Sequence, residues 1–519
     1  MNAQTGFASG AYAQGQAHAA KGRHGAAIAA FEQALAADPN DVKVLFALGN
    51  TARALDMAQA AENFYARVLA LEPGRIEALV NLANLLRAQA RFAEAEALLR
   101  PALAVAPDSA ELRLTLGSVL RESGNAGDAE SAYREALARK PDYPAALANL
   151  ADLAADRGET AAALQLYDRA LKRDPGNAQA RLNRAVLHLL MGNLKDGWRD
   201  YAARLKVAGK VPVPDHTLKR WSGEKLKRTR LLVSAEQGVG DQIMFASAVP
   251  DLCARAKADG GSLILECEPR LVSLFARSFP EATVKPAALE TRGGAIHARY
   301  DWLKAAGGAN AYIEMGSLPK ILRSRLEQFP NPNAYLVPDT DEEARWRGTF
   351  DNAGAGPFIG LCWRSGKSGG GRARQHAPLP AWAAFLREMK GMAVCVQYDA
   401  KDDEIRALEA MSGKTIFVPQ DIDQKNELDR SCALFCALDG VVSAPTAVSW
   451  LAAGVGTPTI KMLYDSSWTA FGARFEPFAP ACLLAAPDKA GDWDDAFAKA
   501  TKTIARLSAN PRARPSAPP

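Results

Sequence analysis

Prolines recur every 34 residues in the first third of this chain, at Pro39, Pro73, Pro107, Pro141 and Pro175. Each proline closes a similar segment, for example FEQALAADP from Phe31 and LYDRALKRDP from Leu166. A fixed period of this length is typical of a helical repeat, whose units bury their apolar faces only by stacking on one another. Residues 8 to 176 are therefore predicted to form an α-solenoid.

The segments between the prolines also match in register. The first helix of successive units reads LFALGN at Leu45, LVNLAN at Leu79, LRLTLG at Leu112 and LANLAD at Leu147. Small residues stand where two helices must cross closely, at Gly49, Ala83, Gly117, Ala151, Ala27, Ala61, Ala95, Ala129 and Ala163. In period, small residues and terminal prolines, this region resembles tetratricopeptide repeats.

A last helix pair, from Ala180, departs from the repeat with Trp198 and Tyr201. It is predicted to cap the array, with an outer face that no further repeat covers, so that residues 1–205 form one domain. Asn81, Asn149 and Asn183 share one position of the first helix. Such asparagines hold peptide backbone in the repeats of O-linked N-acetylglucosamine transferase, and the resemblance implies the same use here. The alternative is a solvated polar face.

The composition indicates a soluble chain of several domains. It has 519 residues, of which 48% are hydrophobic and 23% charged, and no apolar run approaches the ~18 residues that cross a bilayer. A formal charge of +5 gives no reason to expect a nucleic-acid partner. Without a secretion signal at the N-terminus, a cytoplasmic location is expected. The seven cysteines form no CxxC pair and no His-bearing cluster, so reduced core thiols and no metal site are expected.

Strands alternate with helices after a basic, proline-containing linker at 206–229. One series, at 230–340, contains RLLVSAE, SLILECEP and ATVKPA, and a second, at 341–505, contains PFIGLCWRSG, MAVCVQY, TIFVP, GVVSAP and TPTIKML. This alternation predicts parallel sheets with helices on both faces, in two Rossmann-like halves. The fold class is therefore α + α/β, with a disordered tail at 506–519.

The stretch Leu231–Leu252 indicates a ligand site, because a buried strand leads through Gly238 and Gly240 into an apolar helix. A dinucleotide site is one interpretation, with Glu266 or Glu268 on a ribose. However, Ile243 stands where that fingerprint has its third glycine, and such an enzyme would leave the repeats unexplained.

Four motifs occur in the order seen in bacterial tetratricopeptide proteins that carry a GT-B glycosyltransferase module: EQGVGDQIMFASAVP, MGSLP, IGLCWRSG and VVSAPTAVSWLAAGVGTPT. The module is similar to the ADP-heptose transferases of glycosyltransferase family 9. In that family an aspartate after the first strand activates the acceptor hydroxyl, which implies that Asp241 is the catalytic base. Glu236, Gln237, Gly238 and Gly240 would form the acceptor-side loop. The alternative is that Asp241 only caps a helix.

The second series carries the expected donor site. Ser443, Thr446 and Ala447 lie where a strand leads into a helix whose N–H groups suit a phosphate. Arg364, Ser365, Lys367 and His376 lie on a glycine-rich basic loop that also contains Arg372 and Arg374, and Gln397 follows the next strand. The alternatives are a solvent-exposed loop and a structural glutamine. Related families commonly have Asp-Thr-Ala and a later histidine, whereas this chain has Pro445 and Trp450.

The whole pattern resembles bacterial flagellin glycosyltransferases. The resemblance implies a protein O-glycosyltransferase that transfers a nonulosonic acid, activated as a cytidine monophosphate sugar, to Ser or Thr of flagellin held by the repeats, with no cofactor. One alternative is a hexose or heptose transferase that acts on a glycan or another protein. The other is a non-catalytic repeat scaffold in flagellar assembly, whose transferase half is degenerate.

Overall fold

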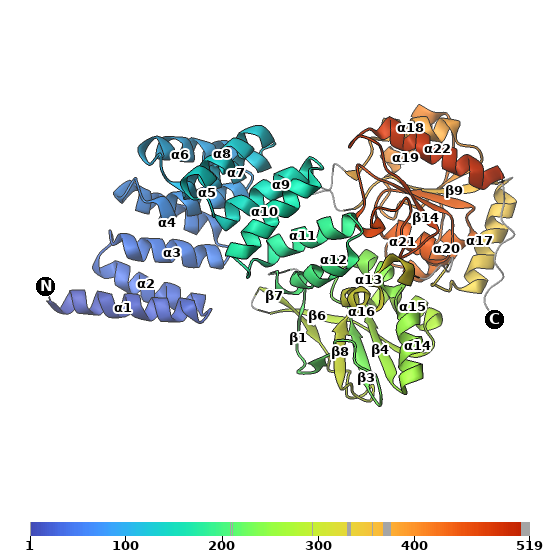
Figure 1. Ribbon diagram of the computed structural model, residues 1–519, viewed down its shortest axis with the longest axis horizontal. Helices are drawn as coiled ribbons and strands as arrows, with labels where there is room; N and C mark the ends of the chain where they lie inside the picture. Colours follow the sequence, from blue (N-terminus) through green and yellow to red (C-terminus); the bar gives the residue numbers. More distant parts are fainter. Residues whose placement is uncertain are drawn as a thin grey trace. The chain divides into compact units, whose positions relative to one another are not determined.

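The computed structural model of the protein describes residues 2–207, 209, 211–292, 294–329, 334–354, 356–366 and 375–509 (Figure 1). The chain divides into two compact units, residues 1–181 and 182–519. The division falls inside helix α11 (Ala178–Leu190), not at residue 205, where the sequence analysis placed the end of the repeat domain.

The first unit is a stack of antiparallel helix pairs (Figure 1). Its helices are α1 (Asn2–Ala20), α2 (His24–Ala37), α3 (Val42–Ala54), α4 (Ala58–Leu71), α5 (Ile76–Ala88), α6 (Phe92–Val105), α7 (Ala110–Glu122), α8 (Ala126–Arg139), α9 (Pro144–Asp156) and α10 (Thr160–Arg173). Local signals set several of their starts. Asp41 caps α3 by accepting from the N–H groups of Lys43 and Val44, and Ser109 caps α7 by accepting from that of Leu112.

Small residues do mark the close helix crossings in the repeats. A Cβ at Gly49 would lie 2.7 Å from the ring of Tyr65, and one at Gly117 would lie 2.5 Å from the ring of Tyr133. These separations are below van der Waals contact, so each glycine lets an aromatic ring of the second helix pack against the backbone of the first. The predicted reason for the small residues is confirmed at both positions.

The capping pair forms part of the core of the second unit. Trp198 and Tyr201 of α12 (Leu194–Tyr201) are 2% and 6% exposed, and Trp198 Nε1 donates to the carbonyl oxygen of Arg323 at 3.1 Å. The prediction of an uncovered outer face is wrong, because two large aromatic side chains need apolar partners and the α/β region supplies them. Phe471 is one, with its ring centroid 5.7 Å from that of Trp198.

The first sheet contains five parallel strands in the order β2-β8-β3-β4-β5. They are β2 (Lys219–Arg220), β3 (Arg230–Ser234), β4 (Ser262–Cys267), β5 (Ala282–Pro286) and β8 (Ala311–Glu314). Helices cover one of its faces: α13 (Val239–Ala246), α14 (Val249–Asp259), α15 (Val272–Ser278) and α16 (Leu318–Leu322). Leu231 and Val233 point to this face, whereas Leu232 points to the other.

The opposite face of this sheet differs from the prediction of helices on both faces. Leu232 and Ile264 pack there against Tyr300 and Leu303, which lie in turns and loops. The chain between β5 and β8 forms a hairpin of β6 (Ala288–Arg292) and β7 (Ala295–Arg299), paired with β1 (Val213–Pro214). Gly294, Gly307 and Gly308 all have a positive φ, which lets the segment turn sharply.

The predicted linker is likewise part of the fold. It supplies β1 and β2 to two sheets, and its Trp221 and Leu226 are buried. Lys225, Lys227 and Arg228 of this segment are exposed.

The second sheet contains six parallel strands in the order β11-β10-β9-β12-β13-β14. They are β9 (Phe358–Cys362), β10 (Met392–Cys395), β11 (Ile416–Phe417), β12 (Gly440–Ser443), β13 (Thr459–Met462) and β14 (Cys482–Ala485). In sequence order this arrangement is 3-2-1-4-5-6, the order of doubly wound dinucleotide-binding domains. Five of the strands were predicted, and β14 was not.

Helices cover both faces of this second sheet, as predicted. One face carries α18 (Leu379–Glu388), α19 (Asp402–Ser412) and α22 (Trp493–Ala509), and the other carries α17 (Thr340–Ala353), α20 (Leu428–Ala437) and α21 (Ala447–Gly454). Helix α22 continues past residue 505, where the ordered part was expected to end, and residues 510–519 lie outside the described residues.

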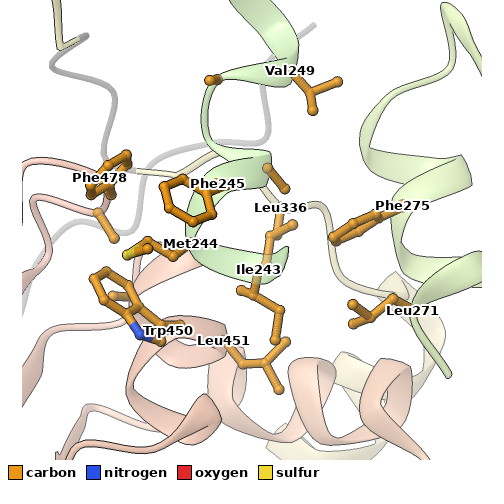
Figure 2. Packing of buried hydrophobic residues seen from close by; sticks show 14 of the residues in the cluster. Ile243, Met244, Phe245, Val249, Leu271, Phe275, Leu336, Trp450, Leu451 and Phe478 are labelled. Atoms are coloured by element: carbon orange, nitrogen blue, oxygen red, sulfur yellow. The ribbon is translucent and has the colours of Figure 1, made fainter. Parts of the chain in front are cut away.

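The two α/β halves share one hydrophobic core. Figure 2 shows α13 of the first half packed on α21 of the second, with Met244 facing Trp450 and Ile243 facing Leu451. Phe245 completes the contact through an edge-to-face arrangement with Phe478, with ring centroids 5.5 Å apart. These side chains hold the helices that open each half's candidate site next to each other.

All seven cysteines are free, and six of them are buried. In the part of the chain that the structure describes, no helix is long and apolar enough to cross a bilayer. No group of three or more His, Cys, Asp or Glu side chains among those residues is arranged to hold a metal ion.

Candidate functional site

The sequence-predicted residues of the α/β region lie at the carboxyl ends of parallel strands. In the first sheet, Glu236 and Gln237 follow β3, and Gly316 and Ser317 follow its neighbour β8. In the second sheet, Arg364 follows β9, and Thr446 follows its neighbour β12. Each pair of neighbouring strands is the point where the strand order reverses, which is where open α/β sheets bind their ligands.

Asp241 stands in the first turn of α13 and is half-buried. The N-cap of this helix is Gly238, so Asp241 is the third helical residue and the N-cap interpretation is wrong. A Cβ on Gly238 would lie 3.6 Å from Asp241 Oδ2, which shows that the carboxylate bends back over the start of its own helix. The helix dipole favours a negative charge there.

The start of α21 lies against the start of α13. A Cβ on Gly240 would lie 3.7 Å from Ala447 Cα and 3.8 Å from Ala447 N. Neither Gly238 nor Gly240 has a positive φ, so neither is needed for a left-handed backbone. Their small size instead allows the close approach of other groups. Two helix N-termini, each with free N–H groups and a partial positive charge, therefore lie side by side with Asp241 in one of them.

Glu236 is held in a buried network that the sequence analysis did not find. Its Oε1 accepts from Arg204 Nη2 at 2.7 Å, from Gln237 Nε2 at 3.0 Å and from the Gly316 N–H at 3.2 Å. Arg204 and Glu236 are both almost fully buried. A Cβ on Gly316 would lie 2.6 Å from Glu236 Oε1, so only glycine permits this contact. These hydrogen bonds hold the acceptor-side loop in place.

Two further residues extend this network. Ser317 Oγ accepts from Arg204 Nη2 at 2.8 Å and from Arg220 Nη2 at 3.1 Å, and Arg220 also pairs with Glu314 at 2.6 Å. The Arg220 guanidinium holds the pKa of Glu314 below its usual range even though burial acts in the opposite direction. The MGSLP motif was the available signal, because it contains Gly316 and Ser317, but nothing in the sequence paired it with Arg204.

Gln237 contacts the last helix of the capping pair. Tyr201 Oη donates to Gln237 Oε1 at 2.9 Å, and the Arg204 guanidinium lies over the Tyr201 ring at 4.8 Å. Burial raises the pKa of Tyr201, so its hydroxyl remains a donor. The side chains of Glu236 and Gln237 therefore form hydrogen bonds within the protein. Among the acceptor-side residues, Asp241 is the one with a half-buried charged side chain next to the starts of α13 and α21.

On the donor side, Thr446 is the N-cap of α21, and its Oγ1 accepts from the Val448 N–H at 3.2 Å. Ser443 is fully buried, and its Oγ donates to the carbonyl oxygen of Ala444 at 2.7 Å. Ala447 is half-buried at the first helical position. Pro445 precedes the N-cap, outside the helix, and is exposed.

Trp450, at which the chain departs from the families that its motifs resemble, packs in the shared core. It is 9% exposed, and Lys461 Nζ lies over its ring at 3.6 Å from the centroid. Lys461 is itself paired with Glu476 at 2.7 Å, and both are buried. The departure at this position therefore serves the packing of the two halves.

Arg364 already has two carboxylate partners. Its guanidinium donates to both oxygens of Glu404, at 2.6 and 2.7 Å, and to Asp399 Oδ2 at 2.9 Å. These bonds raise the pKa of Arg364 and lower that of Glu404. Because the charge is neutralised locally, Arg364 fixes the start of the basic loop, and a donor phosphate would have to compete with Glu404.

The remaining loop residues support the same local structure. Gln397 is 2% exposed, and its Oε1 accepts from the Arg364 N–H at 3.0 Å. His376 Nε2 accepts from the Ser365 N–H at 3.2 Å, and burial together with the nearby Arg364 charge lowers the pKa of His376, so its ring is neutral at pH 7. Lys367 lies outside the described residues, as do Arg372 and Arg374.

In the repeat unit, Asn81 and Asn149 line one cavity of about 320 Å³ between α5, α7 and α9. Thr115 takes the shared position in the intervening repeat and lines the same cavity. Asn183 lies on α11, in the second unit. The structure thus brings together two of the three predicted asparagines.

Models of the tetratricopeptide repeat match residues 8–51, 74–142 and 154–197. The N-terminal unit is an array of tetratricopeptide repeats. Similar solved structures include a thermophilic repeat protein of Thermus thermophilus, which is 27% identical and covers 35% of this chain and 99% of that chain, with a TM-score of 0.32. PilF of Pseudomonas aeruginosa is 21% identical and covers 39% of this chain and 91% of that chain, with a TM-score of 0.33.

One curated relative matches more of the chain than the repeats. Protein FlbA of Caulobacter vibrioides is 32% identical over 337 residues, which are 64% of this chain and 56% of that protein. The chain thus spans little more than half the length of this relative. Since the repeat unit has only 181 residues, the match includes part of the α/β unit.

Proposed function

We propose that the protein is a glycosyltransferase whose α/β unit is a GT-B module and whose tetratricopeptide repeats hold the protein acceptor. The observation that carries this proposal is the side-by-side placement of the α13 and α21 starts, with Asp241 in one of them. Each helix follows a strand at the point where the strand order of its parallel sheet reverses. Such an arrangement suits an acceptor on one side and an activated sugar on the other.

In the proposed reaction, Asp241 accepts the proton of a Ser or Thr hydroxyl on the acceptor. The hydroxyl oxygen then forms a bond to the anomeric carbon of the donor sugar, while the bond from that carbon to the leaving phosphate breaks. The negative charge that develops on the phosphate is stabilised by the N–H groups at the start of α21, near Ala447. A general base of this kind contributes about 10²- to 10⁴-fold to a rate.

The specific form of the proposal is transfer of a nonulosonic acid, from its cytidine monophosphate sugar, to flagellin in the cytoplasm. It is supported by the order of the four motifs, which resembles that of flagellin glycosyltransferases, and by the neutralisation of Arg364 by Glu404. A donor with one phosphate needs fewer cationic partners than a diphosphonucleotide does. A hexose or heptose donor is the alternative within this class.

A non-catalytic scaffold is the second candidate. The pairing of Arg364 with Glu404, cited above for a donor with one phosphate, also favours it. Arg364 is paired with Glu404, and Thr446 caps α21 with its hydroxyl, so these two of the predicted donor contacts are engaged within the protein. In this candidate the repeats bind a partner and the α/β unit transfers nothing.

Intact-protein mass spectrometry separates the candidates. The purified protein is incubated with flagellin and, in separate reactions, with a cytidine monophosphate nonulosonic acid, with nucleoside diphosphate hexoses and with ADP-heptose. The proposal predicts that flagellin gains the mass of one or more nonulosonic acid residues. A hexose- or heptose-sized gain supports the alternative donor, whereas binding of flagellin with no mass gain from any donor supports the scaffold and contradicts the transferase.

A further inference from the structure

The cavity of the repeat unit has an apolar side and a polar side that differ in chemistry. Ile76, Val80, Leu114 and Tyr143 supply the apolar side. The polar side carries Asn81, Asn149, Glu77 and Glu111, and the lining contains no cationic residue. A volume of about 320 Å³ is enough for one or two side chains of a bound segment.

The amide of Asn81 is oriented by the repeat that precedes it. Asn81 Nδ2 donates to Asn50 Oδ1 at 2.8 Å, and Tyr65 Oη donates to the same oxygen at 2.8 Å. Burial raises the pKa of Tyr65, so its hydroxyl keeps its proton and remains a donor. Asn50 Oδ1 thus receives two hydrogen bonds, and the nitrogen of Asn81 is turned toward it.

The same arrangement recurs two repeats further along. Asn149 Nδ2 donates to Ser118 Oγ at 3.2 Å, and Tyr133 Oη lies 3.4 Å from that oxygen. Ser118 donates its own proton to the carbonyl oxygen of Leu114, so its Oγ is an acceptor for both. Burial raises the pKa of Tyr133 as it does that of Tyr65.

These bonds leave hydrogen-bond acceptors on the cavity side. Within the described part of the chain, no hydrogen bond uses the side-chain oxygen of Asn81 or that of Asn149. Each amide has committed one proton to the neighbouring repeat, whereas both lone pairs of its oxygen remain available. The tyrosines are thus positioning residues that aim the asparagine oxygens at a ligand.

Glu77 and Glu111 add negative charge to the same side. They are 34 residues apart, at one shared position of α5 and α7, where the preceding repeat has Lys43 and the following one has Ala145. Each already has a loose ion pair within the protein, with Arg75 Nε at 3.9 Å from Glu77 and Lys140 Nζ at 3.8 Å from Glu111, and both carboxylates are largely exposed. Both carboxylates can therefore take a closer cation.

We propose that this cavity binds a segment of a partner protein in which a Lys or Arg stands next to an aliphatic or aromatic side chain. The cationic group donates to the carboxylates of Glu77 and Glu111 and to the Asn81 oxygen, while the neighbouring side chain packs on Val80 and Leu114. The inference deepens the proposed function, since it rests on the repeats holding the protein acceptor. Because the two carboxylates occur in only two successive repeats, the contact also sets the register of the bound segment.

Three matched peptides test this inference on the full-length protein. Each is acetylated and amidated and contains one Leu followed by Lys, norleucine or Glu in an otherwise identical Ala, Ser and Gly sequence. Norleucine keeps the aliphatic stem of Lys and lacks only the charge. Fluorescence anisotropy is expected to show about fivefold tighter binding of the Lys peptide than of the norleucine peptide, as for a partly exposed ion pair, and weaker binding of the Glu peptide.

Variants identify the groups responsible. The double variant Glu77→Gln/Glu111→Gln is expected to bind the Lys and norleucine peptides equally, without change in the norleucine affinity. Glu94→Gln, whose side chain is exposed on α6 and does not line the cavity, serves as the matched control and should keep the fivefold preference.

Equal binding of the Lys and norleucine peptides to the unaltered protein overturns the inference, as does a preference that survives in the double variant. Failure of all three peptides to bind at millimolar concentration also overturns it. The assay contains no sugar donor, so its result is independent of transfer. A fivefold preference combined with no mass gain on flagellin would support the binding site and reject the transferase.

Discussion

The two units of this protein are stabilised in different ways. Among the residues that the structure describes, every buried charged side chain lies in the second unit: Asp200, Arg204, Glu236, Glu266, Glu314, Arg323, Lys461 and Glu476. The buried polar residues of the repeat unit are hydroxyl-bearing, at Thr51, Ser109 and Thr115. The repeats depend on close packing of small and aromatic residues, whereas the α/β unit also depends on paired charges.

The difference reflects how far apart in sequence the contacting residues are. Tyr65 contacts Gly49 and Asn50 at the same sequence separations at which Tyr133 contacts Gly117 and Ser118. In the second unit, Arg204 contacts Ser317 across 113 residues, and Trp198 contacts Arg323 across 125. Local, repeated contacts tolerate change one unit at a time, whereas a buried charge requires its one specific partner, near or distant in sequence.

The largest expected effect comes from removing one member of a buried pair. Glu476→Ala leaves Lys461 buried beneath Trp450 without its carboxylate, and should destabilise the second unit by about 3–5 kcal/mol. Hydrogen–deuterium exchange measures this in peptides from β12 to β14, with peptides from α3 to α8 in the same sample as the reference.

The double variant Lys461→Met/Glu476→Leu is the control for this experiment. Replacing both charges by apolar side chains of similar volume should restore most of the lost protection. Unchanged exchange in Glu476→Ala would show that the pair with Lys461 does not stabilise the second unit. The proposed difference between the stabilisation of the two units would then be wrong.

The next effect concerns pH. Burial raises the pKa of Glu266 to about 7, against about 4.3 in an unfolded chain, although bonds from the Ala235 N–H and Tyr300 Oη oppose the shift. The contribution of neutral Glu266 to stability is complete below pH 4.3 and is lost as the pH rises to about 7. The second unit should therefore lose about 3–4 kcal/mol over this interval.

Glu266→Gln removes the titration and keeps an acceptor for both bonds. Its unfolding free energy in urea should match that of the parent near pH 4 and exceed it by about 3–4 kcal/mol at pH 8. A difference that does not vary with pH would contradict this account of Glu266.

A smaller effect is expected in the repeats. Gly117→Ala places a Cβ 2.5 Å from the Tyr133 ring, and should destabilise the repeat unit by about 1–3 kcal/mol. Gly127→Ala is the matched control on α8, where a Cβ meets nothing within 4 Å, and should leave stability unchanged or raise it by about 1 kcal/mol. Exchange in α7 and α8 measures both variants, and equal effects would mean that close packing at Gly117 does not matter.

The smallest effect should come from an exposed ion pair in the repeats. Arg100→Gln breaks the pair with Glu96 on α6, whose side chains are 57% and 30% exposed. A change below about 0.5 kcal/mol is expected in the same exchange experiment. A loss of several kcal/mol would show that surface charges in the repeats matter as much as buried ones in the second unit.

The same difference in contact range explains what the sequence could predict. The proline period and the small residues predicted the repeats, because each contact recurs at a fixed spacing. The apolar runs predicted β3 and β9, but not β14 or the hairpin of β6 and β7. The prediction that Trp198 belongs to a capping pair with an uncovered outer face failed. The sequence around Trp198 does not show that its ring packs against Phe471.

The candidate site was predicted in outline only. Asp241 was singled out by the resemblance to glycosyltransferase family 9, and Thr446 because it stands where a strand leads into a helix. Both lie at the carboxyl edge of a parallel sheet. The partners of the other residues could not be found. Arg364 was predicted to face a phosphate, because nothing in the sequence shows that Glu404, 40 residues away on α19, is its carboxylate partner. Arg204, which holds Glu236, lies in a segment assigned to the repeats.

Asp241→Asn tests the central claim most directly. The variant keeps the size of the side chain and removes its ability to accept a proton. Glu224→Gln, on an exposed residue of the loop between β2 and β3, is the matched control. In the flagellin reaction followed by intact mass, Asp241→Asn should transfer at least about 100-fold more slowly than the control, with unchanged hydrogen exchange in α13. Transfer at a near-normal rate by Asp241→Asn, or no transfer by the unaltered protein with any donor, would contradict the account.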